Sequence, residues 1–170
     1  MKTYELQNTT IWSFPNRGNW ATHKGDYRGN WSPHIPKNLI LKYSKPNELI
    51  LDCFVGSGTT LIEAKLLNRN AIGIDISNYA LNISKERLRF DSHNSAKIKL
   101  YQCDAKKMTM LKDNSIDFIC THPPYANIIK YSKNLENDLS LLDYKDFLLH
   151  MDKVSKELYR VLKQGHNCSF

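Results

Sequence analysis

The chain has 170 residues, a length that suits one domain with a buried core and is short for two. Its composition, 41% hydrophobic and 24% charged, is that of a globular protein and excludes a disordered or fibrous chain. The net charge of +7 favours either a polyanionic partner or a solvated basic surface.

Two further classes are excluded by the distribution of residues. No apolar run approaches the roughly 18 residues of a membrane helix, and the N-terminus lacks the pattern of a signal peptide, so we expect a cytoplasmic protein without membrane contacts. The four cysteines, Cys53, Cys103, Cys120 and Cys168, contain no Cys-x-x-Cys pair. This spacing predicts neither a zinc site nor a disulfide framework.

Residues 1–46 are predicted to form an irregular arm or lid. The segment holds all three tryptophans and most of the excess positive charge, but it has neither helical nor strand periodicity. A short helix is expected to begin near Pro36, because proline is tolerated in a first helical turn. We expect the arm to lie over a ligand site of a core formed by residues 47–170.

The core shows strands and helices in alternation. A short apolar strand is followed by glycines and a helix, and the pattern then repeats with further strands. The expected strands are Leu49–Phe54, Ala71–Asp75, Ile98–Gln102 and Ile116–Thr121, and the expected helices are Thr60–Asn68 and a segment from Ser77 or Asn78 to Leu88. Continuous apolar strands of this kind predict an α/β fold, a mostly parallel sheet with helices on both faces.

The last 45 residues begin with a long polar connection over 126–143, and connections of this length are usually functional or mobile. Asp143 is expected to cap a long helix ending at Gly165, after which residues 167–170 open a fifth strand. Because the sequence given stops as this strand opens, we expect the C-terminal strands of the sheet to be missing, and the chain to be a truncated product or one part of an assembly.

Acidic and glycine residues gather at the predicted strand ends. The sequence from Asp52 to Thr60 places Gly56 and Gly58 where a first strand turns into a first helix, a geometry that lets the backbone approach a ligand. It matches neither a dinucleotide fingerprint nor a phosphate-binding P-loop. Asp75 and Asp104 follow the second and third strands, where a carboxylate can accept hydrogen bonds from ribose hydroxyls or from an adenine amino group.

The fourth strand ends in His122-Pro123-Pro124-Tyr125. Two prolines end the strand and hold the backbone rigid, and the tyrosine offers a face on which a planar base can stack. A plain strand-ending turn with a packed tyrosine is the alternative for such a sequence. Its position next to the predicted ligand site favours base binding.

Together these motifs resemble the S-adenosylmethionine-dependent amino-methyltransferases of DNA, which methylate adenine N6 or cytosine N4. The strings that carry the resemblance are Asp52–Thr60, Pro123-Pro124-Tyr125 and the upstream segment Asn30–Pro36. It covers most of residues 10–125 and implies a Rossmann-like methyltransferase fold, with S-adenosylmethionine as cofactor and double-stranded DNA as partner. The implied cofactor contacts are Trp31, Asp52, Phe54, Gly56, Ser57, Gly58, Thr59, Thr60, Asp75 and Asp104, and the implied catalytic residues are His122, Pro123, Pro124 and Tyr125.

The resemblance implies transfer of a methyl group to the amino group of a flipped-out base in a restriction-modification system. His122 departs from the family pattern, which has Asp, Asn or Ser at this position. A neutral imidazole accepts one hydrogen bond and a protonated one accepts none, so we expect activity to fall at acidic pH. Two alternatives stay open: an RNA guanine-N2 methyltransferase, and a non-catalytic or half-enzyme subunit that needs a second chain or a homodimer.

Overall fold

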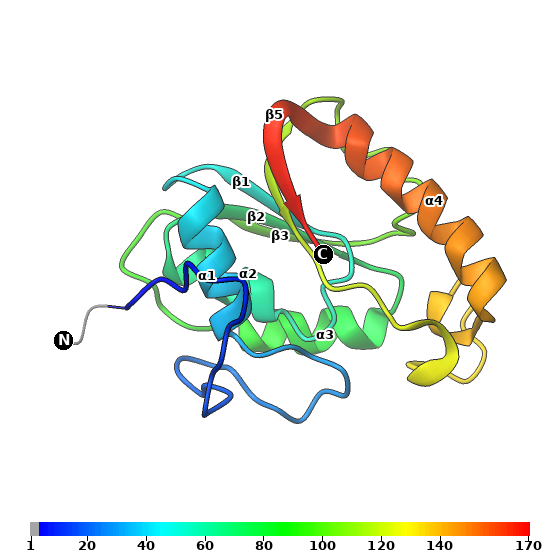
Figure 1. The fold of residues 1–170 in the computed structure, drawn as a ribbon, viewed down its shortest axis with the longest axis horizontal. Helices are drawn as coiled ribbons and strands as arrows, with labels where there is room; N and C mark the ends of the chain where they lie inside the picture. Colours follow the sequence, from blue (N-terminus) through cyan, green and yellow to red (C-terminus); the bar gives the residue numbers. More distant parts are fainter. Residues whose placement is uncertain (1–3) are drawn as a thin grey trace.

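The computed structural model describes residues 4–170, so the first three residues of the predicted arm lie outside the described part. Five parallel strands form one sheet in the order β3-β2-β1-β4-β5 (Figure 1). The strands are β1 (Leu49–Asp52), β2 (Asn70–Asp75), β3 (Ile98–Gln102), β4 (Ile116–Cys120) and β5 (Leu162–Ser169). The strand order reverses between β1 and β4, and ligands of open α/β sheets bind at the carboxyl ends of the strands at such a point.

Helices cover both faces of the sheet, as the sequence predicts. Ile50 of β1 and Phe118 of β4 point to the face that carries α1, α2 and α3, whereas Leu51 and Ile119 point to the face that carries α4. This alternation follows from the two-residue period of a strand. The helices are α1 (His34–Tyr43), α2 (Thr59–Leu66), α3 (Asn78–Arg87) and α4 (Tyr144–Val161). Within residues 4–170, none of them combines the length and apolar composition of a membrane span.

Two predicted helix caps are present. The Ser77 hydroxyl accepts a hydrogen bond from the Ala80 backbone N–H over 3.4 Å at the start of α3. The Asp143 carboxylate accepts one from the Asp146 N–H over 3.0 Å at the start of α4. Each side chain satisfies a backbone donor that the first helical turn leaves without a partner.

The boundary between α4 and β5 differs from the prediction. The helix ends at Val161 rather than at Gly165, and β5 is a full strand from Leu162 to Ser169 rather than the opening of one at 167. The reason is an irregularity in the pairing with β4, where Ile116 pairs with Leu162 but Phe118 already pairs with Asn167. Gly165 lies inside the extra residues with a φ of 76°, so the glycine serves a strand bulge and not a helix end.

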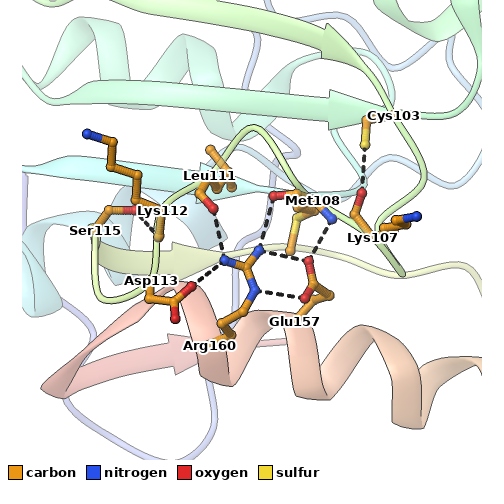
Figure 2. Close-up of polar contacts among 9 residues, drawn as sticks. All are labelled: Cys103, Lys107, Met108, Leu111, Lys112, Asp113, Ser115, Glu157 and Arg160. Atoms are coloured by element: carbon orange, nitrogen blue, oxygen red, sulfur yellow. Dashed lines mark hydrogen bonds and ion pairs between the residues drawn. The ribbon is translucent and has the colours of Figure 1, made fainter.

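One arginine fastens α4 to the loop between β3 and β4 (Figure 2). Arg160 donates to both carboxylate oxygens of Glu157, to the Asp113 carboxylate, and to the carbonyl oxygens of Met108 and Leu111, at distances of 2.7–3.1 Å. The Glu157 carboxylate also accepts from the Met108 N–H over 2.6 Å. Because all five guanidinium N–H groups of Arg160 have an acceptor, the contact specifies arginine rather than lysine.

Candidate active site

A cavity of about 910 Å³, its open mouth included, lies at the carboxyl ends of β1 to β4. Its floor is made by the strand ends and the loop from Cys53 to Gly58. Two segments far apart in the sequence form the opposite wall, namely residues 27–31 of the arm and residues 131–139 of the long connection. We call these two segments the roof.

The glycine loop is shaped by its contacts with α3. Gly56 and Gly58 have φ values of 49° and 85°, which side-chain-bearing residues disfavour. The Ser84 hydroxyl of α3 donates to the Gly56 carbonyl oxygen over 2.7 Å, and a Cβ at Gly58 would lie 3.1 Å from the same hydroxyl oxygen. The loop therefore presses its backbone against α3, which leaves its other side turned to the cavity.

Asp52 is a buried carboxylate in the cavity wall, only 2% exposed. Its Oδ1 accepts hydrogen bonds from the Phe54 N–H over 3.1 Å and from the Thr121 hydroxyl over 2.7 Å. Thr121 follows β4, so this bond joins the ends of the two strands at which the sheet order reverses. Burial raises the pKa of Asp52 to about 6, because the charged form loses its hydration. A cationic ligand group would favour the ionised form.

Asp75 supports the glycine loop and still has free acceptor capacity. Its Oδ2 accepts from the Gly56 N–H and its Oδ1 from the Ser77 N–H, each over 2.9 Å. Burial raises the pKa of this carboxyl group above its usual range. Each oxygen has a second lone pair, so the carboxylate can accept hydrogen bonds from two hydroxyl groups of a ligand in the cavity.

Asp104 lies at the same edge of the cavity, after β3. Its carboxylate accepts a hydrogen bond from the Lys106 N–H over 2.9 Å, and the Lys106 ammonium group lies 3.4 Å from its other oxygen. The Lys106 backbone thus holds the carboxylate in place, and the Lys106 ammonium group compensates its negative charge on one side. Its remaining lone pairs can accept from an amino or hydroxyl group.

The turn after β4 stacks His122 between two aromatic residues. The His122 ring lies parallel to Trp31 at 4.9 Å, with 6° between the planes, and edge-on to Tyr125 at 5.2 Å. Its Nε2 forms a hydrogen bond with the Tyr125 hydroxyl. Burial lowers the pKa of His122, so the imidazole is neutral at pH 7. Trp31 thereby joins the arm to the turn.

The roof closes where its two segments meet. Tyr27 and Tyr131 stack at 6.3 Å, with 18° between the rings. A Cβ at Gly29 would overlap the Tyr131 hydroxyl oxygen and lie 2.9 Å from Cζ of the same ring. Tyr27 also covers Gly56, since its Cε1 atom would lie 3.3 Å from a Cβ there. Only a glycine at position 29 allows this approach.

Asp138 organises the second roof segment. Its carboxylate is 8% exposed and accepts from the Ser132 hydroxyl over 2.6 Å and from the Ser140 N–H over 2.8 Å. The Ser140 hydroxyl in turn accepts from the Tyr131 N–H over 2.9 Å. These bonds fold the connection back on itself, which places Tyr131 against the arm.

The structure brings most of the sequence-predicted site residues to this one cavity. Those that line it are Trp31, Asp52, Phe54, Gly56, Ser57, Thr59, Asp75, Asp104, His122 and Pro124. Four do not line it: Gly58, Thr60, Pro123 and Tyr125. Gly58 precedes α2, and Thr60 is fully buried in the first turn of that helix. Tyr125 is 45% exposed next to Pro124.

Several residues that line the cavity belong to no sequence motif and were not predicted from the sequence. They are Tyr27 from the arm and Tyr131, Ser132, Leu135, Asn137, Asp138 and Leu139 from the long connection. The unusual length of that connection predicted a functional segment but not which of its residues face the cavity. Contacts between the two roof segments join positions about 100 apart in sequence, so local patterns carry no signal for them.

Comparison with known proteins gives a consistent picture. A family model described as DNA methylase matches residues 2–86, and one described as methyltransferase domain matches residues 50–137. The Type II methyltransferase M.HpaI of Haemophilus parainfluenzae is 31% identical over 95% of this chain and 50% of its own length. The Type II methyltransferase M.HinfI of Haemophilus influenzae is 41% identical over 60% of this chain and 30% of its own. The chain thus spans half or less of these relatives.

A solved structure supports the fold. TrmN from Thermus thermophilus superimposes with a TM-score of 0.61 at 20% sequence identity, over 83% of this chain and 38% of that one. At this level of identity the likeness concerns the arrangement of strands and helices.

Proposed function

The chain belongs to the DNA methylase family, and from that premise we propose that it transfers a methyl group from S-adenosylmethionine to an exocyclic amino group of a flipped DNA base. The observation that carries the proposal is the single cavity that joins the carboxylates after β1, β2 and β3 to the His122 turn after β4. A cofactor held by the first set would present its reactive end to a base held at the second. The target atom is adenine N6 or cytosine N4.

The cavity residues fit S-adenosylmethionine. The free lone pairs of Asp75 suit the two ribose hydroxyls, and Asp104 suits the adenine amino group. Asp52 offers a buried carboxylate with a raised pKa, which the ammonium group of the methionine part would compensate. Because Gly56 has no side chain, the backbone there can contact the cofactor directly, and Trp31 covers the end of the cavity nearest His122.

When bound, the cofactor supplies an electrophilic methyl group on a sulfonium. The chain's own residues have to orient a poor nucleophile, because the lone pair of an exocyclic amine is conjugated with the base ring. In the tautomer that donates Nε2–H to the Tyr125 oxygen, His122 keeps Nδ1 as an acceptor for one amine hydrogen. That hydrogen bond biases the amine lone pair away from the ring. Carbonyl oxygens near Pro123 are proposed as the second acceptor.

His122 sets the pH range of this arrangement. A protonated imidazole has no acceptor, so methyl transfer should fall as the pH drops through the lowered pKa of His122. At saturating S-adenosylmethionine, where the affinity for the cofactor no longer limits the rate, His122→Asp supplies an acceptor at every pH above about 4 and should raise the transfer rate and abolish the acidic fall. Loss of all transfer in both His122→Asp and His122→Ser, with cofactor binding intact, would refute this role.

The partner is proposed to be double-stranded DNA. Removing a base from a duplex costs a few kcal/mol, part of which stacking on Tyr125 can return. We propose that residues 1–46 act as a lid on the cofactor, that the protein works on cytoplasmic DNA in a restriction-modification system, and that a second chain or a homodimer contributes to the working enzyme. Of these assignments, the family match and the Type II relatives support DNA as the substrate.

The deciding experiment is product analysis. The protein is incubated with tritiated S-adenosylmethionine and, separately, unmethylated duplex DNA, RNA and protein, and the labelled nucleosides are identified by mass spectrometry. N6-methyladenine or N4-methylcytosine in DNA is the expected product, and sequencing of the DNA locates the site. Label in guanine N2 of RNA alone would replace the proposal with the RNA alternative.

A binding measurement separates an inactive protein from a wrongly assigned site. S-adenosylmethionine at 100 times its dissociation constant should stabilise the folded state by about 2.7 kcal/mol, visible as a higher melting temperature. Stabilisation without transfer would favour the half-enzyme alternative. No stabilisation at millimolar cofactor would remove the cofactor assignment.

A further inference from the structure

Ile128 is an apolar side chain in solvent, directly after the turn that borders the cavity. It ends the short helix η1 (Ala126–Ile128) and is 77% exposed. Exposed isoleucines are common, but this one follows Tyr125 by three residues, and its N–H donates to the Tyr125 carbonyl oxygen over 3.2 Å. Its position is therefore tied to the residue proposed to stack on the target base.

The base of η1 is firmly anchored. Ala126, the first residue of η1, is 7% exposed and has a φ of 46°, so η1 begins at a buried residue in a sharp turn. The N-terminal half of α4 packs against η1 and η2 (Leu139–Leu141), which supports the segment from the other side (Figure 1). Ile128 is thus an exposed apolar side chain next to a segment held by the buried Ala126 and by α4. A side chain that inserts between bases needs such an arrangement.

The surroundings of Ile128 carry positive charge. Lys130 and Lys133 follow it and are exposed, and no acidic residue occurs between 126 and 133. Arg28 is exposed as well, next to the glycine that contacts the Tyr131 ring. The exposed acids in the same connection are Glu136 and Asp143, which lie further along the chain. An apolar tip among cations matches a nucleic-acid duplex, which has phosphates outside and stacked bases inside.

We infer that Ile128 enters the DNA base stack and fills the space that the flipped target base leaves. The inference rests on the proposed function and adds to it the residue that would hold the duplex open. Apolar side chains that intercalate lower the cost of unstacked DNA, because they replace the lost contacts between neighbouring bases. Lys130 and Lys133 would hold the flanking phosphates.

The test uses the full chain and the DNA site identified by product analysis. Two duplexes carry that site, one with the target base paired and one with it opposite an abasic position, which removes the need to open a pair. Methyl transfer is measured on both. A third duplex has a fluorescent base analogue as the target, 2-aminopurine in place of adenine or pyrrolocytosine in place of cytosine. Its fluorescence rises when it leaves the stack and reports flipping independently of transfer.

The variants are Ile128→Ala, the conservative Ile128→Leu, and Leu149→Ala as a control, because Leu149 of α4 is 64% exposed and lies outside both the cavity lining and the proposed lid. Since both side chains are exposed, all three variants should melt within about 2 °C of the wild type. We expect Ile128→Ala to lose the fluorescence signal of flipping and at least about tenfold of the transfer rate on the paired duplex, but less than about twofold on the unpaired one. Ile128→Leu and Leu149→Ala should behave as wild type.

Equal losses on the paired and unpaired duplexes would overturn the inference, because a wedge is not needed once the pair is open. An unchanged rate on the paired duplex would overturn it as well. If the wild-type protein transfers to neither duplex, the proposed function fails and the inference falls with it, an outcome that differs from a defect confined to Ile128→Ala.

Discussion

The roof contact between Gly29 and Tyr131 makes a sharp prediction about cofactor binding. In Gly29→Ala, the new Cβ would overlap the Tyr131 hydroxyl, so the tyrosine ring must leave its place. The displaced ring gives up its stacking with Tyr27, a contact that contributes about 0.5–1.5 kcal/mol in comparable pairs. If the cofactor binds under a closed roof, cofactor binding to Gly29→Ala loses the contribution of this ring contact, about 0.5–1.5 kcal/mol. The dissociation constant of S-adenosylmethionine should therefore rise about two- to tenfold.

Gly165→Ala is the matched control. Gly165 has nearly the same φ, 76° against 77° for Gly29, but a Cβ there would meet nothing within 4 Å. Both substitutions therefore carry the same backbone cost, about 1–2 kcal/mol for an L-residue in the left-handed region, and only Gly29→Ala carries the clash. Their difference isolates the contact with the roof.

Titration calorimetry with S-adenosylmethionine measures both variants. Gly165→Ala should bind within about twofold of the wild type, and combining Gly29→Ala with Tyr131→Ala should bind no worse than Tyr131→Ala alone, since the clash is then absent. Equal affinity in Gly29→Ala and Gly165→Ala would refute the reasoning and would mean that the cofactor binds independently of the roof.

Three further predictions follow from the polar contacts. Asp75→Asn replaces one acceptor oxygen by a donor and leaves a backbone N–H at Gly56 or Ser77 without its partner. Because a hydrogen bond to a charged group is worth about 1.5–3 kcal/mol, the substitution should weaken S-adenosylmethionine binding at least about tenfold in a thermal-shift titration. Unchanged affinity would exclude Asp75 from the ribose site. Asp52 holds its proton more tightly in the folded state, where its pKa is about 6, than in the unfolded chain, so its contribution to stability increases as the pH falls from about 6 towards 3.8. If Asp52 pairs with the ammonium group of the cofactor, as proposed, cofactor affinity should fall over the same range. Asp52→Asn should remove both pH dependences in melting and calorimetric series. Arg160→Lys loses the hydrogen bonds to five acceptors and should lower the free energy of unfolding, measured in urea, by about 1–3 kcal/mol. The control Arg89→Lys disturbs only an exposed ion pair with Glu86 and should change this free energy by less than about 1 kcal/mol. Equal effects would show that the Arg160 contacts do not stabilise the packing of α4.

Local patterns predicted the elements that form the floor of the site. The apolar run at 49–54 and the glycines after it indicate β1 and the turn into α2, because a buried strand and a left-handed backbone each restrict the residues at their own positions. Ser77 and Asp143 mark helix starts for the same reason, since a cap bonds to a backbone group three residues away. The alternation of continuous apolar strands with helices was sufficient to predict a parallel sheet with helices on both faces.

The end of α4 shows where local patterns fail. Gly165 is a good helix terminator by sequence, yet it lies inside β5. What decides its role is the pairing of β5 with β4, in which Phe118 pairs with Asn167 and the residues between form a bulge. Pairing partners are set by the whole sheet, and the residues around position 165 do not encode them.

By itself, then, the sequence determined the α/β core, the glycine loop, the carboxylates at the strand ends and the family to which they belong. The tertiary structure alone decided which residues cover the cavity: Tyr27 and Gly29 meet Tyr131 across about 100 positions of chain, and His122 is held between Trp31 and Tyr125. The physical reason is the range of the forces involved. Strand period, helix caps and left-handed turns act within a few residues, whereas the roof exists only because the folded sheet brings two irregular segments over the same strand ends.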